Sequence, residues 1–218
     1  KSPTDMGVNM AGNCICDDEA CREASGQEII RRYYAALNDL LKGTCSEEPA
    51  QKIELLMNQA GVTIQDRKVV AAALNRAQET QSPAAALELP DGRIITGKTS
   101  NLLGASAALL LNVLKELAGL GHELHIISPE AIEPIQKLKV DYLKSRNPRL
   151  HTDEVLIALS TSAAANEDAR LALEQLPKLH GCQAHTSVML SDVDIKTFQK
   201  LGVQLTCESV YESGHGYY

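Results

Sequence analysis

The sequence predicts an α/β protein in which an N-terminal helical segment precedes a three-layer α/β/α sandwich. Residues 84–119 have the pattern of a strand, a Pro-Asp-Gly turn, a second strand, a polar loop and a long apolar helix. Helices and strands alternate after this stretch, which is typical of parallel crossovers in a layered sheet. Aromatic residues make up only 3 % of the chain, so we expect a core of alanine, leucine, isoleucine and valine.

Three helices are expected before the sandwich, over residues 17–42, 46–59 and 63–78. The acidic residues 17–19 suit the positive end of the first helix, and Gly61 suits the end of the second. Short turns join the three helices, as in a small bundle. We therefore predict a helical subdomain over residues 1–82 and an α/β/α subdomain over residues 83–218.

The second subdomain alternates between helices and strands. Ser128 followed by Pro129, and Ser191 followed by Asp192, are typical helix starts. Helices are expected over residues 103–118, 129–143, 152–164, 167–176 and 192–201. Strands are expected near residues 84–89, 93–97, 123–128, 183–190 and 203–207.

Residues 92–99, Gly-Arg-Ile-Ile-Thr-Gly-Lys-Thr, match the Walker A pattern of phosphate-binding loops. Such a loop follows a strand and needs flexible residues, so that its backbone N–H groups can wrap around phosphate. Here the residues between the two glycines favour a strand, and Gly92 closes a hairpin turn. We predict a hairpin, and ATP hydrolysis through this stretch is kept as a minor alternative.

Composition excludes several classes of function. The net charge of −7 argues against nucleic acid as a partner. No apolar run is long enough to span a membrane, and the start of the chain lacks the pattern of a signal peptide. Because the first residue is lysine and not methionine, we expect a piece of a longer chain.

The six cysteines are irregularly spaced, which indicates a reducing, cytoplasmic environment. Cys14, Cys16 and Cys21 lie close enough in sequence to supply part of a metal site. No second cluster completes four ligands with the spacing of a zinc site, so no metal is predicted. No cofactor can be assigned.

Residues 86–97, ALELPDGRIITG, resemble the strand, turn and strand that open the core of cytidine deaminases. In those enzymes a His or Cys zinc ligand and a Glu follow at the start of the next helix, and a Pro-Cys-x-x-Cys comes later. Residues 104–108, Gly-Ala-Ser-Ala-Ala, contain none of these groups, and the chain has no Cys-x-x-Cys. The resemblance implies the deaminase-like fold without the zinc chemistry.

Long segments of the chain resemble the bacterial uncharacterised protein family 0371. They include KSPTDMGVNMAG, LPDGRIITGKTSNLLGASAALLLN, ISPEAIEPIQKLK and NPRLHTDEVLIALS. Members of that family are longer, and the resemblance is to their C-terminal part. No activity is assigned to the family, so the resemblance carries over no catalytic residue.

An anion site is predicted where the loop after residue 96 meets the following helix. Open α/β sheets bind ligands at the carboxyl ends of their strands, and free N–H groups at a helix start attract anions. The loop is taken to follow a central strand. The candidate ligand-binding residues are Lys98, Thr99, Ser100, Asn101 and Ser106, with Arg149 and His151 from a basic loop, and Lys1, Ser2, Asp5 and Asn9 from the first segment.

Two functions follow as hypotheses. The chain binds a phosphorylated or nucleotide-like small molecule as part of a larger enzyme, with the N-terminal region of the same full-length protein as a partner. Alternatively, it is a non-catalytic interaction module whose Ala/Leu-rich helices form a homo-oligomer. Whether the chain catalyses any reaction is left open.

Overall fold

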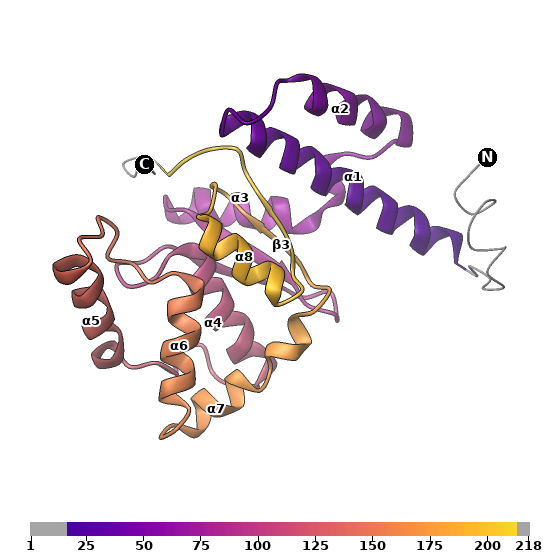
Figure 1. The fold of residues 1–218 in the computed structure, drawn as a ribbon. Coiled ribbons are helices and arrows are strands. Elements are labelled where there is room, and N and C mark those ends of the chain that lie inside the picture. Colours follow the sequence, from indigo (N-terminus) through magenta and orange to yellow (C-terminus); the bar gives the residue numbers. More distant parts are fainter. Residues whose placement is uncertain (1–16, 213–218) are drawn as a thin grey trace.

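The computed structural model describes residues 17–212 of the chain. In this range helices lie on both faces of an open, four-stranded mixed sheet (Figure 1). The expected α/β class is therefore confirmed. The elements are α1 (Asp18–Leu41), α2 (Glu48–Ala60), the 3-10 turn η3 (Ile64–Asp66), α3 (Lys68–Thr80), β1 (Ala84–Glu88), β2 (Ile94–Lys98), α4 (Ala105–Leu117), α5 (Pro129–Lys137), the π-helical η4 (Leu138–Tyr142), α6 (Thr152–Ser162), α7 (Glu167–Leu173), the 3-10 turn η5 (Leu176–Leu179), β3 (Gln183–Thr186), α8 (Asp192–Lys200) and β4 (Gln204–Cys207).

The sheet has the strand order β2-β1-β3-β4. β1 pairs antiparallel with both β2 and β3, and only β3 and β4 are parallel. The expectation of parallel crossovers is therefore met by one strand pair only. β2 lies at an edge of the sheet, which corrects the assumption that the predicted anion-binding loop follows a central strand.

The hairpin prediction for residues 92–99 is confirmed. Gly92 has a φ of 82° in the turn, where its N–H donates to the carbonyl of Leu89 at 2.9 Å. The following residues form β2 and pair with β1 in register, from Glu88 opposite Ile94 to Ala84 opposite Lys98. A paired strand cannot wrap around phosphate, so the Walker A interpretation is wrong.

The strand expected near residues 123–128 is absent from the described structure. Ile126 and Ile127 are buried, but this segment is a series of turns outside the sheet. The ammonium of Lys115 donates to the carbonyls of His122, at 2.7 Å, and Leu124, at 3.5 Å. Because a lysine satisfies these carbonyls, the segment can bury its isoleucines without a neighbouring strand.

The side chains of β1 point alternately to the two faces of the sheet and so contribute to two separate parts of the core. Ala85 and Leu87 join the large cluster that contains α4, whereas Ala86 packs against Val69 and Ala73 of α3. α1 contacts β4 and shares a small apolar cluster with Val70 of α3, and α8 contacts both β4 and α6. The helices of the first 82 residues thus share a core with the sheet, while the subdomain boundary itself remains a prediction.

A buried arginine ties α3 to the sheet. Arg67 is 1 % exposed and donates to the hydroxyl of Thr206 at 3.0 Å and to the carbonyl of Ala184 at 3.0 Å. It forms no ion pair within residues 17–212, and burial lowers its pKa to about 10. The same Thr206 hydroxyl lies 2.8 Å from Nδ1 of His185, which is fully buried. A cation held by neutral acceptors therefore joins three elements.

β2 and α4 are in backbone contact at Gly97. A Cβ atom on Gly97 would lie 2.2 Å from the backbone nitrogen of Leu109, where no such atom fits. The amide of Asn112 adds a hydrogen bond to the carbonyl of Thr96 at 3.0 Å. The second glycine of the Walker-like stretch is thus required by a helix and not by phosphate.

We predict that Gly97→Ala destabilises the protein by about 3 kcal/mol, because the methyl group forces α4 away from β2. Gly104→Ala is the control, since the nearest atom to an added Cβ there is a carbonyl oxygen at 3.9 Å. It should cost less than about 1 kcal/mol. Urea unfolding monitored by circular dichroism measures both values, and equal losses would contradict the role given to Gly97.

Candidate functional site

The starts of α4, α6 and α8 meet at a small cavity, which we call the inner pocket. It lies beyond the carboxyl ends of β2 and β3, which both run antiparallel to β1. Its volume is about 30 Å³, which suits one or two water molecules or a single small oxyanion. The lining residues are Thr99, Gly104, Ala105, Ser106, Asn147, Arg149, Leu150, His151, Val188, Met189, Leu190, Asp194 and Glu212.

The start of α4 supplies hydrogen-bond donors to the inner pocket. Gly104 is the N-cap, so no side chain accepts from the first N–H groups of this 13-residue helix. Ser106, in the first turn, is only 2 % exposed, and its hydroxyl makes no hydrogen bond to any residue between 17 and 212. A buried serine whose hydroxyl has no partner among the described residues, beside a positive helix end, favours an anion.

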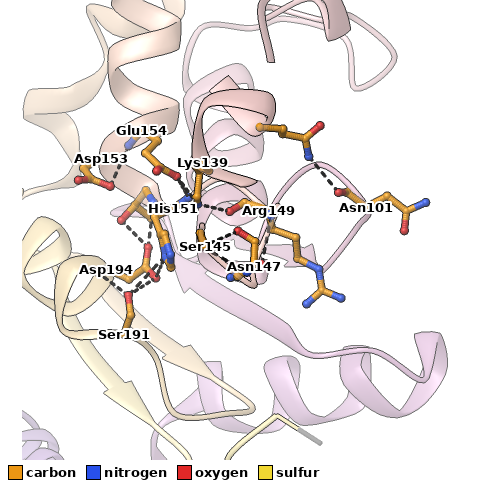
Figure 2. Close-up of polar contacts among 12 residues, drawn as sticks. Asn101, Lys139, Ser145, Asn147, Arg149, His151, Asp153, Glu154, Ser191 and Asp194 are labelled. Carbon is orange, nitrogen blue, oxygen red and sulfur yellow. Dashed lines mark hydrogen bonds and ion pairs between the residues drawn. The ribbon is translucent and has the colours of Figure 1, made fainter. Parts of the chain in front are cut away.

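Asp194 holds the starts of α6 and α8 together. One carboxylate oxygen accepts from the backbone N–H and the hydroxyl of Thr152, both at 2.8 Å. The other accepts from the Ser191 hydroxyl at 2.7 Å and lies 2.9 Å from Nδ1 of His151 (Figure 2). Burial opposes ionisation of Asp194, but its hydrogen bonds, led by that to His151, outweigh burial and lower its pKa.

His151 is the N-cap residue of α6 and lines the inner pocket. Its hydrogen bond to Asp194 raises the pKa of the imidazole, against the opposing effect of burial. Lys139 secures the chain on either side of it: the ammonium donates to the carbonyl of Arg149 at 2.6 Å and to Glu154 at 2.8 Å (Figure 2). Glu154 in turn accepts from the backbone N–H of His151 at 2.8 Å. The ring is therefore held at the pocket wall.

Arg149 contributes a guanidinium to the pocket. Nη1 donates to Glu212 at 2.7 Å, and Asn147 orients the residue by accepting its backbone N–H at 3.1 Å. Nε and Nη2 make no hydrogen bond with residues 17–212, so donors remain for a ligand.

A larger cavity, the outer pocket, adjoins the inner one. Its volume is about 510 Å³. The two pockets share Thr99, Arg149, Val188 and Glu212. The remaining lining residues are Gln81, Ser82, Pro83, Ser100, Asn101, Val210 and Tyr211.

Six of the predicted site residues come together at these pockets. Thr99, Ser106, Arg149 and His151 line the inner pocket, and Ser100 and Asn101 line the outer one. Lys98 is exposed at the end of β2 and lines neither pocket, so the geometry gives it no role in binding. Lys1, Ser2, Asp5 and Asn9 lie outside the described residues.

Several residues that organise the site were not predicted from the sequence. They are Asp194, Glu212, Lys139, Glu154 and Asn147. A local signal existed for two of them: Asp194 follows Ser191 by three residues, and Glu154 follows His151 by three, which is the spacing of a capping box. The contact between Arg149 and Glu212 joins residues 63 positions apart and leaves no local signal.

No group of three or more potential metal ligands occurs in the part of the chain that the structure describes. Cys14 and Cys16 lie outside that part, so the absence of a metal site there remains a prediction. Over the same residues, no helix has the length and apolar character needed to cross a membrane.

Comparison with known proteins identifies similar sequences without an assigned activity. The domain of unknown function DUF1846, N-terminal, matches residues 1–61, and the domain of unknown function DUF1846, C-terminal, matches residues 65–217. A UPF0371 protein of Corynebacterium urealyticum is 58 % identical over 211 residues, covering 97 % of this chain and 42 % of the relative. A UPF0371 protein of Streptococcus thermophilus is 52 % identical over 211 residues, covering 97 % and 43 %. The chain thus spans less than half the length of these relatives.

We predict that Asp194→Ala destabilises the protein by about 3 kcal/mol. The substitution removes the acceptor for Thr152, Ser191 and His151, and so leaves buried donors unsatisfied at two helix starts. Asp192→Ala is the matched control in the same first turn, because its exposed ion pair with Lys42 should be worth less than about 1 kcal/mol. Urea unfolding tests both variants, and a loss at Asp194 no larger than at Asp192 would refute the bridging role.

Proposed function

We propose that this chain, which belongs to the UPF0371/DUF1846 family, binds an anionic, phosphorylated small molecule in the inner pocket. The names of the family assign no activity, so the proposal rests on the site. The observation that carries the proposal is Ser106, a buried residue that lines the pocket and whose hydroxyl makes no hydrogen bond with a described residue. It lies in the first turn of α4, where the backbone N–H groups lack a side-chain cap. Both features suit a phosphate oxygen.

The charges around the pocket support the same ligand. Two carboxylates line it, but Asp194 already accepts from Thr152, Ser191 and His151, and Glu212 accepts from Arg149. Apart from the second oxygen of Glu212, the groups left to meet a ligand are donors: the Ser106 hydroxyl, the start of α4 and the Arg149 guanidinium. His151 adds positive charge when it is protonated.

We further propose that the chain binds this ligand as part of a larger enzyme. The relatives are more than twice as long as this chain, and in such a protein the N-terminal region would act as the partner that completes the site. The hairpin of β1 and β2 followed by α4 supports the proposed likeness to the cytidine-deaminase-like fold, without its zinc ligands. The described cysteines are free, which supports the proposed cytoplasmic location.

A second candidate function is self-association. The π-helical segment η4 and the residue after it present apolar side chains to solvent: Leu138 is 50 % exposed, Tyr142 70 % and Leu143 69 %. Such a surface suits contact with another copy of the chain or with another protein. A mass that rises with protein concentration, with no change on adding an anion, would favour this candidate over the first.

We predict that sulfate binds to the purified protein and that Ser106→Ala weakens this binding about tenfold or more, because a hydrogen bond to a charged oxygen is lost. Lys98→Ala is the control for non-specific attraction and should change the affinity less than about twofold. Isothermal titration calorimetry gives the dissociation constants. Equal effects of the two substitutions, or no binding of sulfate or inorganic phosphate, would rule out the inner pocket as an anion site.

The affinity for sulfate should also depend on pH. The hydrogen bond to Asp194 raises the pKa of His151, so the ring stays positive to a higher pH than usual. Sulfate keeps its charge near neutral pH, so we expect its affinity to fall about threefold or more as the pH rises through the raised pKa. Titrations from pH 6 to 9 measure the change. An affinity that is flat in the wild type, or that falls equally in His151→Asn, would contradict this role of His151.

A further inference from the structure

The two adjoining pockets suit a ligand with two different parts. The inner pocket has a volume of about 30 Å³ and suits a small group such as one oxyanion, whereas the outer pocket offers about 510 Å³. Both are bordered by Thr99, Arg149 and Glu212, so a group bound in one would lie beside a group bound in the other. A phosphate in the inner pocket therefore leaves room for a larger body next to it.

The outer pocket is built for neutral, hydrogen-bonding groups. Its polar side chains include Gln81, Ser82, Ser100 and Asn101, which can both donate and accept. Among the residues that the structure describes, Arg149 is the only cationic side chain that lines it, and that guanidinium borders the inner pocket as well. A second phosphate would thus meet no further cation from these residues in the outer pocket.

The carboxylate of Glu212 favours a ligand that carries hydrogen-bond donors. One of its carboxylate oxygens accepts from Arg149, and the other makes no hydrogen bond with any residue that the structure describes. A carboxylate oxygen at this border repels a second anion and accepts hydrogen bonds from hydroxyl groups. The body of the ligand should therefore carry hydroxyls and no charge.

On these grounds we propose that the ligand is a sugar monophosphate, either free or within a nucleoside monophosphate, with its phosphate in the inner pocket and its hydroxyl-bearing sugar in the outer pocket beside Glu212 and Asn101. This inference rests on the proposed anion site. It adds the class of the ligand and assigns a use to the outer pocket.

The test compares four probes by isothermal titration calorimetry on the intact chain: inorganic phosphate, ribose 5-phosphate, adenosine monophosphate and adenosine diphosphate. We expect ribose 5-phosphate to bind at least tenfold more tightly than inorganic phosphate. A nucleoside monophosphate that binds more tightly still would identify the nucleotide as the source of the sugar phosphate, and equal affinity would identify the free sugar. The diphosphate should bind more weakly than the monophosphate.

Substitutions then assign each part of the ligand to a pocket. Asn101→Ala and Glu212→Gln should each reduce the preference for ribose 5-phosphate over inorganic phosphate at least threefold. Ser106→Ala should weaken both probes by the same factor, because it acts on the phosphate alone. Thermal melting of each variant without ligand identifies any variant that is unfolded. If Glu212→Gln is unfolded, Asn101→Ala still provides the test, because Asn101 is an exposed position.

The outcomes separate the two proposals. If inorganic phosphate binds and depends on Ser106 but the sugar adds no affinity, the sugar phosphate inference is wrong and the anion site stands. The same holds if the sugar adds affinity that neither Asn101→Ala nor Glu212→Gln reduces, or if the diphosphate binds best. If none of the four probes binds, both proposals are wrong.

Discussion

The contact between the backbones of β2 and α4 at Gly97 is the constraint on which the pockets depend. A strand and a helix can approach this closely only where the strand lacks a side chain. The contact determines where α4 lies over the hairpin and so brings its uncapped start beside Thr99, just past the end of β2. Thr99 is itself tied back by its N–H to the carbonyl of Pro83 at 2.8 Å. The floor of the inner pocket is thus a consequence of packing in the core.

The wall of the inner pocket formed by the starts of α6 and α8 depends on a single carboxylate. Asp194 belongs to the first turn of α8 but also satisfies the start of α6, so the two helices cannot move independently without exposing a buried charge. Lys139 and Glu154 extend this arrangement to the loop that carries Arg149. Because the wall's internal charges are matched in this way, its geometry is set before a ligand arrives, which reduces the entropy cost of binding.

The sequence could predict those features that arise from neighbouring residues. The Pro-Asp-Gly turn, the Ser191 cap and the apolar helix after residue 103 all have local physical causes, and four of the five expected strands exist in the structure. The strand expected near residue 125 is absent because Lys115, from a separate element, satisfies the carbonyls of His122 and Leu124 that a neighbouring strand would otherwise satisfy. Polar loops and a helix start indicated six residues that line the two pockets, whereas the ion pair of Arg149 and the contacts of Arg67 bring distant segments together and leave no pattern in the sequence.

Lys98 has a structural position that differs from the ligand-binding role predicted from its sequence context. It stands at the exposed end of β2, a strand with no strand neighbour on its outer side in the described sheet. The backbone N–H and C=O groups of such an edge invite a strand from another molecule, and the first step toward an insoluble aggregate is often this kind of pairing. A charged side chain on an edge strand opposes such pairing, because its hydration is disturbed when another strand packs alongside. The residue that resembles the lysine of a nucleotide-binding motif thus stands where charged residues commonly protect an edge strand from pairing with another molecule.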